Sequence, residues 1–150
     1  MSQVIEFRTG MSDVSPVLGP NSDDLKKGWA IRAIARERWL TPEEILDFLR
    51  NFRAMGFSTS RQPAQDTSNG QLYIFDRSEL YHFKSDGGNW VKRKKESDRV
   101  REDFSKLSID GEWCLTGFYT RGAIDTSHMR RCYREKAEKS ALHIVHYRHT

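Results

Sequence analysis

Apolar residues recur with two different periods along the chain, and the change of period separates predicted helices from predicted strands. The segment 41–44 (TPEE) combines a capping threonine, a proline in the first turn and a capping-box glutamate, which together favour a helix start. A helix is therefore predicted from this segment to Gly56, and a less regular pattern predicts another over residues 23–39. The clearest helical face consists of Ile45, Phe48, Leu49 and Phe52.

Beyond residue 70, short apolar and aromatic runs bounded by turn residues predict strands. A third helix is predicted from Ser97 or Asp98 to about Leu107, because apolar residues recur there three and four positions apart. Helices followed by strands favour a single α+β domain, with two N-terminal helices and one further helix packed on an antiparallel sheet. The predicted strands cover residues 72–75, 80–83, 89–94, 113–120, 129–134 and 142–147.

The composition fits one folded unit. The chain has 150 residues, and 37% of them are hydrophobic, which allows one domain with its own core. Residues 1–22 are rich in turn formers and are expected to form a flexible tail, with the folded domain over residues 23–150. No apolar run is long enough for a membrane span. The two cysteines form no paired motif, and we expect a reduced intracellular protein.

Positive charge is clustered in two segments of the chain, although the net charge is small. The formal net charge is only +4, but residues 92–101 and residues 130–136 each hold a cluster of cations. Within residues 86–95 (DGGNWVKRKK), a glycine turn precedes Trp90 and four successive cations, an arrangement that suits a polyanion such as nucleic acid. Trp90 either stacks on a base or anchors the root of this segment, and its residue type favours the anchor. Asn89 either reaches a base edge or occupies the turn, and the turn is favoured.

Enzyme chemistry finds no support in the sequence. Nucleophile-elbow, phosphate-loop, dinucleotide and zinc-protease motifs are missing from it. His143 and His146 fall on opposite faces of a predicted strand, and His128 with the two cysteines has no regular ligand spacing. We therefore expect no enzymatic activity, no metal site and no cofactor.

Seven segments, in order and over about residues 29–149, resemble the DNA-binding domain of the calmodulin-binding transcription activators, the CAMTA family. The sequence departs from the family pattern at Gly88 and over residues 118–122. The matching segments are 38–45 (RWLTPEEI), 70–77 (GQLYIFDR), 83–90, 92–95 (KRKK), 100–102 (VRE), 130–133 (RRCY) and 143–147 (HIVHY).

The resemblance implies a nuclear, sequence-specific reader of double-stranded DNA that prefers a CGCG-containing element. The family's ankyrin repeats and calmodulin-binding segments have no counterpart here, so calmodulin is expected as a partner only through regions absent from this chain. The oligomeric state is left open. The alternative is a protein-interaction module whose basic face meets an acidic partner.

Arginine and lysine match the acceptors of guanine in the major groove, so the basic run supplies the candidates for base contact. The sequence does not choose between a β-ribbon and the predicted third helix as the element that enters the groove. The candidates at or near the bases are Lys92, Arg93, Lys94 and Lys95, together with Asn89 and Trp90. The candidates for phosphate contact are Arg77, Lys84, Arg99, Arg101 and either Arg130 or Arg131.

Overall fold

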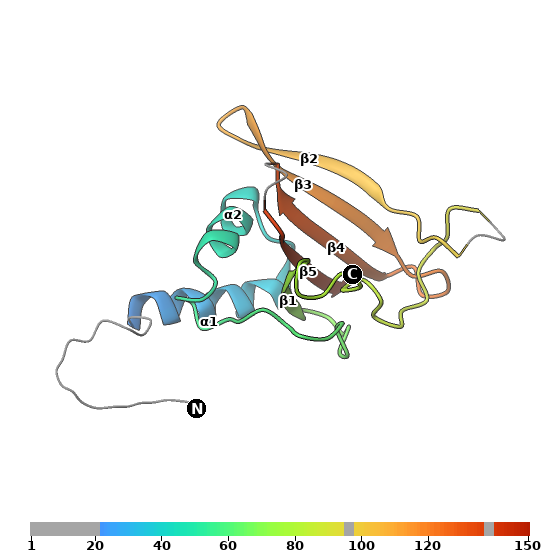
Figure 1. Ribbon diagram of the computed structural model, residues 1–150, viewed down its shortest axis with the longest axis horizontal. Coiled ribbons are helices and arrows are strands. Elements are labelled where there is room, and N and C mark those ends of the chain that lie inside the picture. The colour runs from blue at the N-terminus through green and yellow to red at the C-terminus, as the bar shows by residue number, and fades with distance from the viewer. Residues whose placement is uncertain (1–21, 95–97, 137–139) are drawn as a thin grey trace.

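The computed structural model describes residues 22–94, 98–136 and 140–150. Two helices, α1 (Ser22–Glu37) and α2 (Pro42–Asn51), pack beside one five-stranded antiparallel sheet (Figure 1). The α+β prediction is therefore confirmed. Almost all of the expected tail, residues 1–21, lies outside the described residues. Neither described helix is long and apolar enough to cross a membrane.

The sheet brings the two ends of the domain together. Its spatial order is β1-β5-β4-β3-β2, so the first strand pairs with the last, and Ile74 lies opposite Ile144. The predicted strands that correspond to β1, β3, β4 and β5 are confirmed. The strands are β1 (Leu72–Asp76), β2 (Asp103–Ile109), β3 (Glu112–Arg121), β4 (His128–Glu135) and β5 (Leu142–His149).

The predicted start of α2 is confirmed atom by atom. Thr41 Oγ1 accepts a hydrogen bond from the Glu44 amide at 3.2 Å, and Glu44 Oε1 accepts one from the Thr41 amide at 2.8 Å. Arg38 donates to both oxygens of Glu44, and this contact lowers the pKa of Glu44 to about 2. The regular helix ends at Asn51, before the predicted end, and turns carry the chain on to Gly56.

The predicted third helix is wrong. The second half of its described part, from Asp103 onward, forms strand β2, which pairs with β3 from Asp103 opposite Tyr119 to Ile109 opposite Glu112. Asp110 and Gly111 join the two strands with φ values of 52° and 80°. An Asp-Gly pair is a strong signal for a two-residue hairpin, because both turn positions need a left-handed backbone. This signal outweighs the helical spacing of the apolar residues upstream.

Two predicted strands between β1 and β2 are also wrong. Residues 80–83 form turns, and residues 89–94 make only isolated bridges, Trp90 with Gly122 and Lys92 with Val100. The expected meander does not form because β5, from the far end of the sequence, takes the place beside β1. The segment between β1 and the bridges instead packs on the sheet.

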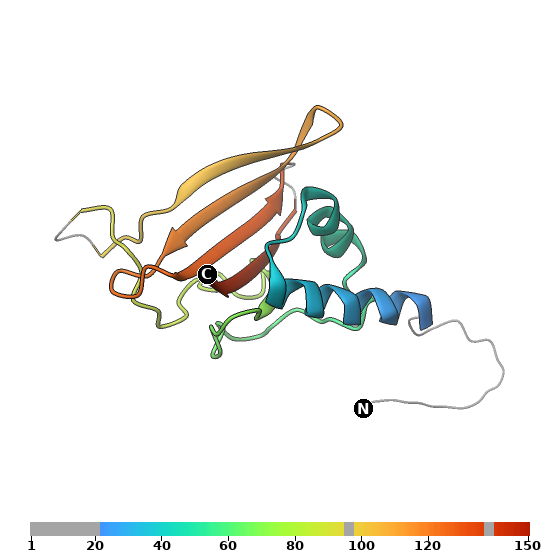
Figure 2. The ribbon, with the colours of Figure 1, turned by 180° about the vertical axis from the view of Figure 1, so that it is seen from behind.

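The sheet has a different cover on each side. We call the side under α1 and α2 the helix face, where Phe48, Leu115, Tyr133 and Ile144 belong to one buried cluster. We call the other side the loop face, where residues 77–90 cover the sheet through Phe83 and Trp90. There the buried cluster consists of Ala64, Phe75, Phe83, Trp90, Cys132, Val145 and Tyr147. Figure 2 shows both helices at the end of the molecule away from residues 91–94 and 98–101.

Candidate nucleic-acid interface

A buried arginine lies at the centre of the loop face. Arg130 of β4 is 1% exposed, and its Nη1 donates to Asp86 Oδ2 at 2.9 Å and to the Lys84 carbonyl at 3.1 Å. Its Nη2 lies 3.7 Å from Glu102 Oε2, while the other oxygen of Glu102 accepts from Lys84 Nζ at 2.9 Å. Two cations and two carboxylates thus offset one another inside the protein, as buried charges require.

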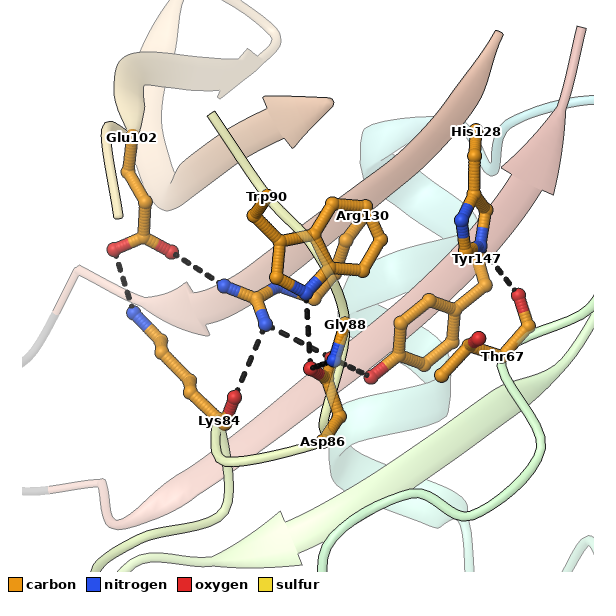
Figure 3. Close-up of polar contacts among 9 residues, drawn as sticks. All are labelled: Thr67, Lys84, Asp86, Gly88, Trp90, Glu102, His128, Arg130 and Tyr147. Carbon is orange, nitrogen blue, oxygen red and sulfur yellow. Dashed lines mark hydrogen bonds and ion pairs between the residues drawn. The ribbon is translucent and has the colours of Figure 1, made fainter. Parts of the chain in front are cut away.

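Asp86 ties this network to the aromatic cluster. Its Oδ1 accepts from the Trp90 indole at 2.9 Å and from the Gly88 amide at 3.0 Å, and its Oδ2 accepts from the Tyr147 hydroxyl at 2.7 Å (Figure 3). Burial alone would raise the pKa of Asp86, but Arg130 and these donors hold the pKa below its ordinary value. Asp86 therefore remains an anion that joins the turn at 86–88 to β4 and β5.

Trp90 anchors this region and is not available to stack on a base. It is 3% exposed, and its ring lies 5.0 Å from Arg130 Cζ and 4.8 Å from the ring of His128. Gly88 fits closely against it, because a Cβ at Gly88 would come within 2.3 Å of the indole nitrogen. The anchor interpretation of Trp90 is confirmed. The prediction that Trp90 also contacts DNA is corrected, because its ring is buried.

The described residues beyond Trp90, 91–94 and 98–101, form a projection of two paired segments that we call the basic arm. Val91 O accepts from the Arg101 amide at 2.8 Å, and the Arg93 amide donates to Arg99 O at 2.9 Å. The arm leaves the end of the sheet where β3 stops (Figure 1). Its described cations, all exposed, are Lys92, Arg93, Lys94, Arg99 and Arg101; Lys95 lies outside the described residues.

Few carboxylates offset the charge of the arm. Asp98 is the only acidic residue among its described positions, and it lies 4.0 Å from Lys92 with both side chains well exposed. Arg101 lies 3.5 Å from Asp103, again at the surface. Such exposed pairs are weak and are screened by salt, so the arm retains a positive field.

A shallow pocket of about 350 Å³ lies at the root of the arm. Asn89, Lys92 and Lys94 line it together with Arg121, the last residue of β3. The backbone carbonyl of Asn89 also accepts from the Ala123 amide at 2.8 Å, which fixes this edge to the loop after β3. Arg121 was not among the predicted contacts, although its place directly after a predicted strand was a signal.

The other predicted contacts separate into three places. Arg77 and Lys84 lie on the loop face and line a second pocket, with Lys84 beside Glu102 and Arg77 farther from the arm. Arg131 lies on the helix face, where its Cζ is 4.2 Å from the rings of both Trp39 and Tyr119. Arg130 is buried in the network, so its predicted phosphate contact is corrected. The alternation of Arg130 and Arg131 between faces is as predicted.

Within the described residues, no group of three or more histidine, cysteine or acidic side chains is arranged to hold a metal ion. His143 and His146 lie on opposite faces of β5, as predicted. His146 Nε2 lies 2.8 Å from the Ala35 carbonyl of α1, whereas the ring of His143 packs against Phe83 on the loop face.

Comparison with known proteins identifies the family. Residues 34–150 match the model of the CG-1 domain. The chain belongs to the CG-1 domain family. It is 36% identical over 115 residues to calmodulin-binding transcription activator 2 of Arabidopsis thaliana, and 34% identical over 112 residues to the human protein of that name. A third relative, calmodulin-binding transcription activator CBT of rice, is 35% identical over 119 residues.

These matches cover 75–79% of the chain but only 9–12% of each relative. The chain thus corresponds to about a tenth of the length of those proteins. No solved structure matches it significantly. The resemblance to the calmodulin-binding transcription activators is confirmed, and the CG-1 match includes the network, the anchor and the basic arm.

Proposed function

We propose that this CG-1 domain binds double-stranded DNA sequence-specifically, as part of a nuclear transcription factor, and that the basic arm makes the contacts. The observation that carries the proposal is the arm itself, whose described residues hold five exposed cations against one carboxylate, within a domain whose relatives are named transcription activators. The proposed target is an element that contains CGCG. Its guanines present paired acceptors in the major groove, which arginine matches with two parallel hydrogen bonds.

The buried network supports a specific rather than a diffuse contact. Base reading needs donors that are fixed before DNA arrives, because ordering them on binding lowers the affinity. Trp90 precedes the arm and is held by Asp86, while Glu102 follows the arm and is held by Lys84 and Arg130. Both ends of the arm are therefore fixed to the sheet, at Trp90 by buried contacts and at Glu102 by partly buried ones.

The test of the proposal is fluorescence anisotropy of the chain on a CGCG duplex and on a scrambled duplex of equal composition, over a salt series. We expect tighter binding to CGCG that persists near physiological salt. Equal affinities that fall in parallel as salt rises would overturn sequence reading. They would favour a basic face that meets acidic partners without base contacts.

Arg93→Ala tests the arm directly. We expect it to weaken binding to CGCG by about 1–3 kcal/mol and binding to the scrambled duplex by less. Lys26→Ala, at an exposed position on α1, is the matched control because it removes a cation at a distance from the arm. Equal losses on both duplexes would assign Arg93 to a phosphate rather than to a base.

A further inference from the structure

A pocket of about 890 Å³ opens on the loop face; Lys84, paired with Glu102, lines its side toward the basic arm, and Arg77 and Arg134 line the side away from it. The pocket lies between the turns that follow β1, the middle of β3 and residues 140 and 141 before β5. Its lining contains three cations, Arg77, Lys84 and Arg134, and no carboxylate among the described residues. Phe118 and Tyr81 supply aromatic walls.

Two of the three cations keep their charge available. Lys84 is paired with Glu102 at 2.9 Å, but no described carboxylate lies within 4.0 Å of Arg77 or Arg134. Each guanidinium instead lies against a ring, Arg77 at 4.9 Å from Tyr81 and Arg134 at 5.6 Å from Phe118. A guanidinium on a ring face keeps its N–H groups at the edge, where they match phosphate oxygens.

The three cations line the same pocket as one buried side chain, His143. Burial lowers the pKa of His143, which lines the pocket, and Lys84, Arg134 and Arg77 lower it further, to about 4. His143 is therefore neutral at pH 7 and takes no share in the positive charge. The pocket combines a net positive field with polar and aromatic walls, a combination that suits a phosphate group.

We propose that this pocket binds a phosphate of the DNA backbone that flanks the element held by the basic arm. The inference rests on the proposed function and extends its footprint. Met129 of β4 lies opposite Arg121 at the root of the arm, and Arg134 lies five residues farther along the strand, roughly 17 Å at about 3.3 Å per residue. Duplex DNA rises about 3.4 Å per base pair, so roughly five base pairs separate the root of the arm from Arg134.

The experiment compares two CGCG duplexes, one limited to the element and one extended by about ten base pairs on each side, over a salt series. Wild-type chain is compared with Arg134→Met, which keeps an apolar stem against Phe118, and with Arg134→Lys, which keeps the charge. Lys26→Met is the control for loss of a distant cation. Thermal unfolding of each variant verifies that it is folded.

The salt slope is the slope of the logarithm of the binding constant against the logarithm of the salt concentration. We expect Arg134→Met to reduce this slope by about one unit on the extended duplex and to leave the slope on the short duplex unchanged. Arg134→Lys should keep the slope, and the preference for CGCG over a scrambled core should be unchanged in every variant. Equal slopes for wild type and Arg134→Met on the extended duplex would overturn the proposal. Missing CGCG preference in the wild type on the short duplex is a separate result, and it would refute the proposed function instead.

A final titration with inorganic pyrophosphate distinguishes a DNA phosphate from a free phosphate compound as the ligand. Binding is monitored through the NMR resonances of the His143 ring. Binding that requires Arg134, together with no effect of duplex extension, would assign the pocket to a small phosphorylated ligand and overturn the DNA assignment. Displacement of bound pyrophosphate by the extended duplex, and not by the short one, would support the backbone phosphate.

Discussion

The two faces of the sheet are stabilised by different interactions. On the helix face, Phe48 and Ile144 are completely buried in an apolar cluster, where the stabilisation comes from area removed from water. On the loop face, the buried centre is an arginine held by Asp86 and Glu102. Buried ion pairs contribute little net stability because desolvation opposes them, but their hydrogen bonds fix direction. We infer that the helix face supplies most of the stability and that the loop face sets the position of the basic arm.

The largest expected effect comes from the helix face. Phe48 is 0% exposed and packs edge-on against Phe57 at 4.6 Å, so Phe48→Ala leaves a cavity in the cluster. We expect it to lower the free energy of unfolding by about 3–5 kcal/mol. Urea denaturation followed by circular dichroism measures this loss. A loss below 1 kcal/mol would place the main stabilising cluster elsewhere.

The next effect comes from the centre of the loop face. Asp86→Asn removes the negative charge beside Arg130 and keeps the size of the side chain, so Glu102 remains as the one partner carboxylate of the buried guanidinium. We expect a loss of about 3 kcal/mol in unfolding free energy, because the buried guanidinium keeps its charge but loses the nearer of these two carboxylates. The same denaturation experiment applies, with Asp110→Asn in the exposed β2–β3 turn as control. A variant as stable as the wild type would show that the ion pair carries no structural role.

An effect that is smaller for each residue comes from pH and involves both faces. Burial lowers the pKa of both His143 and His146 to about 4, from an ordinary value of 6.5. The unfolded chain therefore binds more protons than the folded one between these values, and stability is lost as the pH falls below about 6.5. Each histidine should cost about 2 kcal/mol at pH 5 relative to pH 8. Thermal unfolding across this range tests the prediction, and a melting temperature that stays flat from pH 8 to pH 5 would refute it.

The same contrast explains what the sequence could predict. Local signals gave the helix face: the capping box of Thr41 and Glu44 and the apolar spacing of Ile45, Phe48 and Leu49 all act within one helix. The loop face depends on distant partners, because Arg130 is 44 residues from Asp86 and Tyr147 is 61 residues from it. No local pattern pairs such residues.

The errors in the prediction have local causes. The third helix was predicted from apolar spacing alone, and the Asp110-Gly111 hairpin signal was overlooked. Residues 80–83 look like a strand, but only Phe83 is buried there, stacked on Phe75 at 5.3 Å. For the candidate site, the basic arm was predicted from its charge, whereas the buried position of Arg130 and the contribution of Arg121 to the pocket at the root of the arm required the structure.

The most direct test of the two-face assignment is the ratio of affinities for CGCG and scrambled duplexes, measured by anisotropy for wild type, Asp86→Asn and Phe48→Leu. All three are measured at a temperature at which each is folded. We expect Phe48→Leu to be less stable but to keep the wild-type ratio of affinities. In Asp86→Asn we expect this ratio to fall about tenfold, because the arm is no longer fixed at Trp90. An unchanged ratio in Asp86→Asn, or an equal loss in both variants, would contradict the assignment.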